Sequence, residues 1–215
     1  MKEMHPVEVK VWGQYALFTQ PEMKVERMSY PCMTPSAARG ILEAIFWKPE
    51  FWWEVREIQI LKPIRFQSIL RNEVSQVVPE TIKGKYRSDY YADEDRTQRH
   101  SMVLYDVAYL IRAQIRLLEH ATDDVAKYRD QFRRRVKKGQ CFHRPYLGCR
   151  EFAAYFAEPN GEEKPENLTQ EVGTMLFDLQ YGKTEKDPTI PHFFHARIEN
   201  GTLHVPEEKY RLLGR

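Results

Sequence analysis

Residues 107–117 carry a core-type side chain at every second position. These residues are Val107, Tyr109, Ile111, Ala113, Ile115 and Leu117. Because successive side chains of a strand point to opposite faces of a sheet, this period of two predicts a strand. The wider segment 101–118 is rich in Val, Leu, Ile and Tyr, and we expect the strand to cover it. A chain with such a strand must pair it within a sheet.

Two strands and a helix are expected before this segment. Residues 7–11 alternate between valine and charged side chains, which predicts a half-buried strand, and residues 54–62 alternate again. Thr34 suits an N-cap and Pro35 suits the first helical position, so a helix should begin there. Its apolar face would hold Ala38, Ile41, Leu42 and Ile45. The polar segment 71–98 has the composition of an extended hairpin or a mobile loop.

A second helix is expected to begin at Thr122. Its hydroxyl would cap the helix, and Asp123 and Asp124 would lie near the positive end of the helix dipole. Gly139 would end the helix, and residues 151–156 should form another strand. The apolar stripe of this helix is predicted to be Val125, Tyr128, Phe132 and Val136.

The order of these elements predicts an α+β fold. Strand, helix, strand, hairpin, strand, helix and strand approximate a ferredoxin-like (RRM-like) domain with an inserted hairpin, over residues 1–158. Residues 159–215 are predicted to form a small antiparallel β appendage. Within it, Asn200-Gly201 should be the turn between strands at residues 195–198 and 203–205.

One segment holds a concentration of positive charge. Residues 127–150 contain nine basic residues and a single acid, Asp130, whereas the rest of the chain has 24 basic and 30 acidic residues. Such a run is either a solvated helix face or a surface that binds phosphates. Phe142, Tyr146, Phe152 and Tyr155 are interleaved with these charges or follow them. Cations that track phosphates and aromatic rings that stack on unpaired bases suit single-stranded RNA, although Phe152 and Tyr155 are equally suited to a core.

The composition predicts a soluble protein of a reducing cytoplasm. Cys32, Cys141 and Cys149 are odd in number and share no CxxC spacing. The first eleven residues lack the apolar run of a signal peptide, and no stretch approaches the roughly 20 apolar residues that span a bilayer.

Metal and nucleotide-cofactor chemistry have no matching motif. His192 and His195 have an HxxH spacing, but a strand would point their side chains to opposite faces. The chain also lacks GxxxxGK[ST], GxGxxG, HExxH and GxSxG patterns. We therefore predict no metal and no cofactor.

Four segments resemble a known family. They are residues 13–19 (GQYALFT), 45–49 (IFWKP), 146–152 (YLGCREF) and 173–175 (GTM). In this order they are similar to the CRISPR-associated family five of subtype I-C, also called Dvulg. The resemblance covers nearly the whole chain.

This resemblance implies a function and partners. Members have a ferredoxin-like domain and a small C-terminal β domain, bind the repeat hairpin of precursor CRISPR RNA and cut beside it without a metal. The RNA's own 2′-hydroxyl attacks the neighbouring phosphate. The mature CRISPR RNA then stays bound by its 5′ handle in the Cascade interference complex, with the backbone and large subunits of subtype I-C.

The resemblance also assigns a catalytic site. The family has a tyrosine at the end of the first helix and a Lys-His pair on the second, and these positions correspond to Phe46 and to Lys127-Tyr128. Only the lysine matches. Phe46 has no proton to transfer, and Tyr128, with an ordinary pKa of about 10, is a poor base at neutral pH. The expected RNA-binding residues are Phe46, Trp47, Lys48, Arg133, Arg134, Lys137, Lys138, His143, Arg144 and Arg150.

Three functions remain open from the sequence. In the first, Lys127 stabilises the phosphorane while Tyr128, His120 or His143 moves protons, and the protein is an endoribonuclease. In the second, it is a non-catalytic RNA-binding subunit of the complex. In the third, the basic surface binds duplex DNA.

Overall fold

The computed structural model describes residues 6–23, 25–74, 96–182, 184 and 187–213. The strands are β1 (Val7–Ala16), β2 (Arg27–Met28), β3 (Phe51–Ile60), β4 (Phe66–Val74), β5 (Arg96–Leu117), β6 (Tyr155–Ala157), β7 (Gln170–Gln180), β8 (Ile190–Glu199) and β9 (Thr202–His204). The helices are α1 (Pro35–Ile45), α2 (Val125–Lys137) and α3 (Glu208–Leu212).

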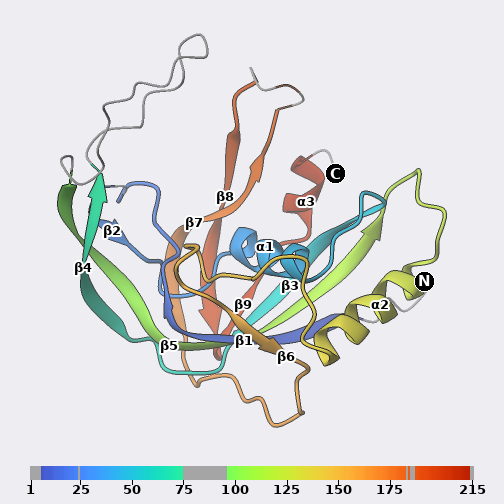
Figure 1. Cartoon of the computed structure of the whole chain (residues 1–215), viewed down its shortest axis with the longest axis horizontal. Coiled ribbons are helices and arrows are strands. Elements are labelled where there is room, and N and C mark those ends of the chain that lie inside the picture. The colour runs from blue at the N-terminus through green and yellow to red at the C-terminus, as the bar shows by residue number, and fades with distance from the viewer. Residues whose placement is uncertain (1–5, 24, 75–95, 183, 185–186, 214–215) are drawn as a thin grey trace.

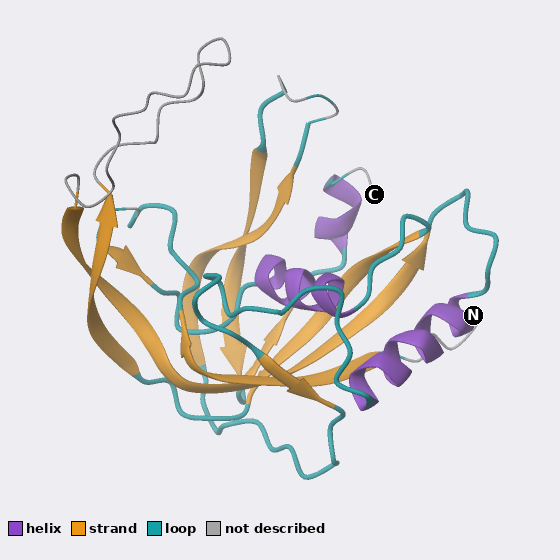
Figure 2. Cartoon of the chain, viewed as in Figure 1, coloured by secondary structure: helices purple, strands orange, loops and turns teal. Residues whose placement is uncertain are grey.

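Within the described residues, the nine strands form one curled sheet (Figures 1 and 2). Its main path runs β6-β1-β5-β3-β9-β8-β7, and β2 and β4 pair with β5 off this path. The β2–β5 pairing is parallel and the other strand pairings are antiparallel. The sheet thus belongs to a mixed α and β architecture, as predicted.

The strand predicted from the alternation is confirmed as β5. Its residues 107, 109, 111, 113 and 115 are buried, whereas Leu117 is 37% exposed at the end of the strand. β5 pairs with both β1 and β3 along this half and with β4 along its first half. β5 is therefore the central strand of the sheet.

Helix α1 begins and packs as predicted. The Thr34 Oγ1 accepts a hydrogen bond from the Ala37 amide at 3.2 Å, and Pro35 is the first helical residue. The four predicted apolar residues are buried. The helix ends at Ile45 because Phe46 is extended, so the chain turns directly toward β3.

Helix α2 has a different cap from the predicted one. Thr122 lies outside the helix, and the cap is Asp124, whose carboxylate accepts from the Ala126 amide at 3.2 Å. A carboxylate two residues closer to the helix therefore takes the role that we expected of the Thr122 hydroxyl. The predicted stripe holds, since Tyr128, Phe132 and Val136 are buried. Gly139 follows the helix with a φ of +62°, which suits the predicted ending.

The strand expected at residues 151–156 is shorter and later, because β6 covers only Tyr155–Ala157. The preceding residues turn back on themselves: the Leu147 amide donates to the Phe152 carbonyl at 2.7 Å, and the Phe152 amide donates to Cys149. Gly148 has a φ of +85°, and a Cβ there would lie 2.0 Å from the Leu17 carbonyl oxygen. The turn is therefore held tightly against the end of β1.

The C-terminal strands continue the same sheet. The Asn200-Gly201 turn is confirmed, with φ of +48° and +74°, and it joins β8 to β9. β9 then pairs with β3, and the Tyr210 hydroxyl donates to the Val55 carbonyl at 2.9 Å. The division of the chain at residue 158 stays a prediction.

The hairpin expected within residues 71–98 lies mostly outside the described residues. Its described base is the antiparallel pairing of β4 with the first half of β5. In the described ranges, we find no helix with both the length and the apolar character needed to cross a membrane.

Candidate active site and nucleic-acid interface

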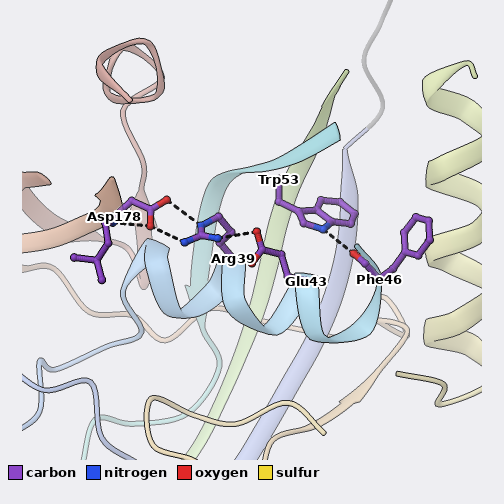
Figure 3. Close-up of polar contacts among 6 residues, drawn as sticks. Arg39, Glu43, Phe46, Trp53 and Asp178 are labelled. Carbon is purple, nitrogen blue, oxygen red and sulfur yellow. Dashed lines mark hydrogen bonds and ion pairs between the residues drawn. The ribbon is translucent and has the colours of Figure 1, made fainter. Parts of the chain in front are cut away.

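The connection between α1 and β3 places Phe46 in the core and its neighbours on the surface. Phe46 is 1% exposed, and its ring lies 5.5 Å from the ring of Phe51. The Phe46 carbonyl accepts from the Trp53 indole at 3.0 Å, and Figure 3 shows the Phe46 ring directed toward α2. The ring is therefore not available to stack on a base in this structure. Trp47, at 57% exposure, and Lys48 are on the surface.

The loop after α2 is fixed against the last turn of α1. The Phe142 and His143 amides both donate to the Ala44 carbonyl, at 2.8 and 3.3 Å, and the Arg135 guanidinium donates to the Ile45 carbonyl at 2.8 Å. Carbonyls at a helix end need such donors. Two segments distant in sequence, residues 46–48 and 142–143, are thereby brought to one end of α1. Phe142 is 82% exposed there.

Lys127 lies on the surface at the first turn of α2. Its ammonium group contacts the Asp123 carboxylate at 2.8 Å, and this hydrogen bond raises the pKa of Lys127 above its ordinary value. The Lys127 side chain is nevertheless 63% exposed. Lys127 is therefore a permanent cation at neutral pH and is accessible to a phosphate.

Tyr128 lies beside Lys127 in sequence but inside the protein. It is 2% exposed, and its ring lies 5.1 Å from that of Phe51. Its hydroxyl oxygen is buried and has no hydrogen-bond partner among the described residues. Burial raises the pKa of Tyr128, and the negative charges of Glu50 and Asp123 raise it further. The hydroxyl stays protonated at neutral pH, so it can donate a hydrogen bond but is poorly suited to accept a proton.

Glu50 and His120 complete this end of the site. The His120 Nε2 lies 3.0 Å from the Pro49 carbonyl oxygen, and the Leu118 amide donates to the Glu50 carbonyl at 2.9 Å. The Glu50 charge contributes to the raised pKa of both Lys127 and Tyr128. Sequence reasoning missed Glu50, because nothing in a lone carboxylate after a proline indicates that it faces a helix some 75 residues later.

Six of the predicted basic residues form no ion pair with a described residue. Arg133, Arg134 and Lys137 on α2, Lys138 at its C-cap, and Arg144 and Arg150 after it are all exposed. In the described part of the chain, none of these six contacts a carboxylate within salt-bridge distance. Elsewhere arginines such as Arg39, Arg56 and Arg112 each contact acids. The six cations are therefore free to contact phosphates.

A pair of stacked aromatic rings, of which Tyr155 is exposed and Trp12 half-buried, lies beside Arg144. Tyr155 on β6 lies 6.1 Å from Trp12 on β1 at an interplanar angle of 24°, and the Arg144 guanidinium lies 5.9 Å from the Tyr155 ring. Tyr155 is 54% exposed, so it is a surface residue, whereas Phe152 is half-buried against Tyr15. Trp12 was not predicted, since only the pairing of β6 with β1 brings it to Arg144.

Similarity to known proteins covers most of the chain. The family model of CRISPR-associated protein (Cas_Cas5), in its Cas5d form, matches residues 7–206. The chain belongs to this family. It is also 50% identical to the CRISPR pre-crRNA endoribonuclease Cas5d of Thermus thermophilus, over 99% of this chain and 96% of that one. The protein of the same name from Mannheimia succiniciproducens is 42% identical, over 93% of this chain and 94% of its own.

Two crystal structures share the fold of this Cas5d family member. One, of a CRISPR-associated protein, matches with a TM-score of 0.68 at 23% identity, over 95% of this chain and 93% of its own. The other, of a functionally uncharacterized protein from Streptococcus mutans, matches with a TM-score of 0.67 at 21% identity, over 95% and 94%.

A cavity of about 500 Å³ lies at the other end of α1. Arg39 in its wall donates to both oxygens of Asp178 at 2.9 and 2.8 Å and to Glu43 at 2.7 Å (Figure 3). The loop that carries the basic residues contributes Tyr146 and Gly148 to the lining. The Arg39 guanidinium is bound by carboxylates, so it differs from Arg133, Arg134 and Lys137 of α2, which form no ion pair with a described residue.

The two histidines with HxxH spacing have separate partners. His192 contacts Gln180 at 2.9 Å and His195 contacts Glu171 at 3.2 Å.

The predicted site residues lie in two places. Lys127 and Tyr128 lie with Glu50 near the α1–β3 connection. The six exposed cations continue from there along α2 and its following loop.

Proposed function

We propose that this protein binds the repeat hairpin of precursor CRISPR RNA, cuts beside it and keeps the 5′ handle of the product. One observation carries the proposal: the chain is 50% identical, over 99% of its length, to a protein named a CRISPR pre-crRNA endoribonuclease. The unpaired cations of α2 and the exposed rings beside them support it, because this combination suits RNA with unpaired bases.

The proposed reaction is a transesterification within the RNA. The 2′-hydroxyl attacks the adjacent phosphorus, the bond to the 5′ oxygen breaks, and a 2′,3′-cyclic phosphate results. Lys127 would stabilise the negative charge that develops on the phosphate oxygens, since its cation is exposed and permanent. Tyr128 would act through its neutral hydroxyl as a hydrogen-bond donor, a role that requires RNA binding to expose this buried group. We propose that no step needs a metal ion or a cofactor.

Incubation of the purified protein with its cognate repeat RNA tests this function. We expect a single cut beside the hairpin, after which the handle fragment co-elutes with the protein in gel filtration. Intact RNA that co-elutes with the protein would instead favour a second candidate, a non-catalytic RNA-binding subunit. The observations that favour this second candidate are the buried positions of Phe46 and Tyr128.

The basic surface of α2 should set the salt dependence of RNA binding. Replacing Arg133, Arg134 and Lys138 by Ala removes three candidate phosphate contacts, so the slope of log affinity against log salt should fall by roughly 2. An equal removal of charge at Lys164, Arg197 and Arg211, which are exposed and lie outside α2, should leave the slope unchanged. Equal slopes in both triple variants would show that the α2 face is only solvated.

The assembly and domain organisation are also proposals. We propose that the bound handle anchors the protein to the backbone and large Cascade subunits in the cytoplasm, and that duplex DNA competes for the same cations. For residues 1–158 the antiparallel order β6-β1-β5-β3, with α1 and α2 as crossovers, supports a ferredoxin-like domain. Residues 159–215 would follow this domain as an appendage that is joined to it through the β3–β9 pairing.

A further inference from the structure

The carboxylate of Glu50 has an unusual environment for a half-buried acid. Its Oε2 is fully buried without a hydrogen-bond partner, and no ion pair joins Glu50 to any residue that the structure describes. Other acids with buried side chains are paired. Glu54, Glu163 and Asp178 have side-chain exposures of 3% each, and each contacts an arginine or lysine within 3.2 Å. Because a buried polar atom without a hydrogen-bond partner is costly, Glu50 Oε2 calls for an explanation.

The position of Glu50 is fixed from both sides by backbone contacts. Its carbonyl accepts from the Leu118 amide at 2.9 Å, and the preceding Pro49 carbonyl contacts His120 at 3.0 Å. The next residue, Phe51, packs its ring 5.1 Å from that of Tyr128. The segment 49–51 is therefore held between the end of β5 and the first turn of α2, beside Lys127.

A second unpaired polar atom lies in the same place. The Tyr128 hydroxyl is buried without a partner in the described residues, as is Glu50 Oε2. Two polar groups left unpaired next to one exposed lysine are expected where a ligand or a reacting group completes the hydrogen bonds.

The other groups near Lys127 are poorly suited to accept the proton of the 2′-hydroxyl. Phe46 has no proton to exchange, and Lys127 and Tyr128 both hold their protons at neutral pH. The His120 Nε2 is engaged with the Pro49 carbonyl oxygen at 3.0 Å. The Asp123 carboxylate is occupied by Lys127 at 2.8 Å. Cleavage by the 2′-hydroxyl still needs a group that accepts its proton.

We propose that Glu50 is that group: its carboxylate, beside the Lys127 ammonium, accepts the proton of the attacking 2′-hydroxyl. This inference rests on the proposed function. As the 2′ oxygen bonds to phosphorus, its proton passes to Glu50. The bond to the 5′ oxygen breaks, and this oxygen takes a proton from water. Glu50 returns its proton to the hydroxide that remains, so no proton is consumed. Lys127 stabilises the charge on the phosphate throughout.

The test compares single-turnover cleavage by three carboxylate variants at saturating protein. Glu50→Gln keeps the shape but cannot accept the proton, so the rate constant should fall about 10²- to 10⁴-fold. RNA affinity should be unchanged or slightly higher, because a negative charge is lost. Glu50→Asp should recover part of the rate. Glu119→Gln removes the same charge from an exposed residue of the adjacent loop and should cleave normally.

Each other outcome counts against the assignment. A wild-type rate in Glu50→Gln would overturn it, and a matching loss in His120→Ala or His143→Ala would then give the role to that histidine. A Glu50→Gln protein that melts early or fails to fold would make Glu50 structural. If the unmodified protein binds its RNA without cutting it, the proposed function itself fails. If instead the wild-type protein and the Glu50→Gln variant cleave at equal rates, the proposed function stands and only the assignment of Glu50 fails.

Discussion

A single 2′-deoxy substitution at the nucleotide that is cut should abolish cleavage of the repeat RNA and leave its affinity for the protein unchanged. The 2′-hydroxyl is the proposed nucleophile, so its removal leaves no group to attack the phosphate. Affinity should persist because the proposed contacts of the six unpaired cations with phosphates and of the exposed rings with bases are not altered by the substitution.

The control for this experiment is a 2′-deoxy substitution one nucleotide further into the hairpin. It removes the same hydroxyl but spares the nucleophile, so this RNA should be cut at the normal rate. Measured cutting of the first substrate would contradict the mechanism, because the attacking oxygen would then have to come from water.

Replacing Lys127 by Ala should slow cleavage by about 10²- to 10³-fold, comparable with the loss of one donor positioned at a developing negative charge. The Lys127 cation is 63% exposed and is held at the first turn of α2 by Asp123. Because its pKa is raised, the cation persists through the neutral and mildly alkaline range, and the lysine itself should cause no fall in wild-type rate there. RNA affinity should change little, since one lysine among nine basic residues contributes a small share of the binding.

The matched control is Lys137→Ala, which removes the same exposed cation from the last turn of the helix. It should weaken binding slightly and leave the single-turnover rate constant unchanged. Equal rate constants for the two lysine variants would place the transition-state charge elsewhere.

Tyr128→Phe distinguishes two roles for the neighbouring ring. The ring contact with Phe51 is kept, and only a buried hydroxyl without a partner in the described residues is lost. The melting temperature should therefore stay the same or rise. If the hydroxyl donates to the phosphate, the cleavage rate constant should fall modestly; an unchanged rate constant would make Tyr128 a core residue alone.

Much of the fold follows from local patterns in the sequence. The alternation within β5 and the Thr34-Pro35 start of α1 each had a single physical interpretation, and both predictions hold. The cap of α2 was less determined, because Thr122 and Asp124 both suit a cap and their choice depends on where the helix packs. The position of β6 depends on the turn that Gly148 makes against Leu17, which is a tertiary contact.

The site was predictable only where charge or family resemblance indicated it. The basic run of α2 was visible as a concentration of lysine and arginine. Glu50 and Trp12 carried no such signal. Each acquires a role through pairing between distant segments, Glu50 through its contact with Leu118 and Trp12 through the pairing of β1 with β6. Burial of Phe46 likewise depends on how α2 packs over the end of α1.

The most direct test of the central claim is the chemistry of the fragment ends after incubation of the purified protein with its cognate repeat RNA in excess EDTA. Metal-independent attack by the 2′-hydroxyl predicts a single cut with a 2′,3′-cyclic phosphate on the upstream fragment and a 5′-hydroxyl on the downstream one, at the same rate as in magnesium. Intact RNA in EDTA that is cut only when magnesium is restored, or a 5′-phosphate on the downstream fragment, would contradict it.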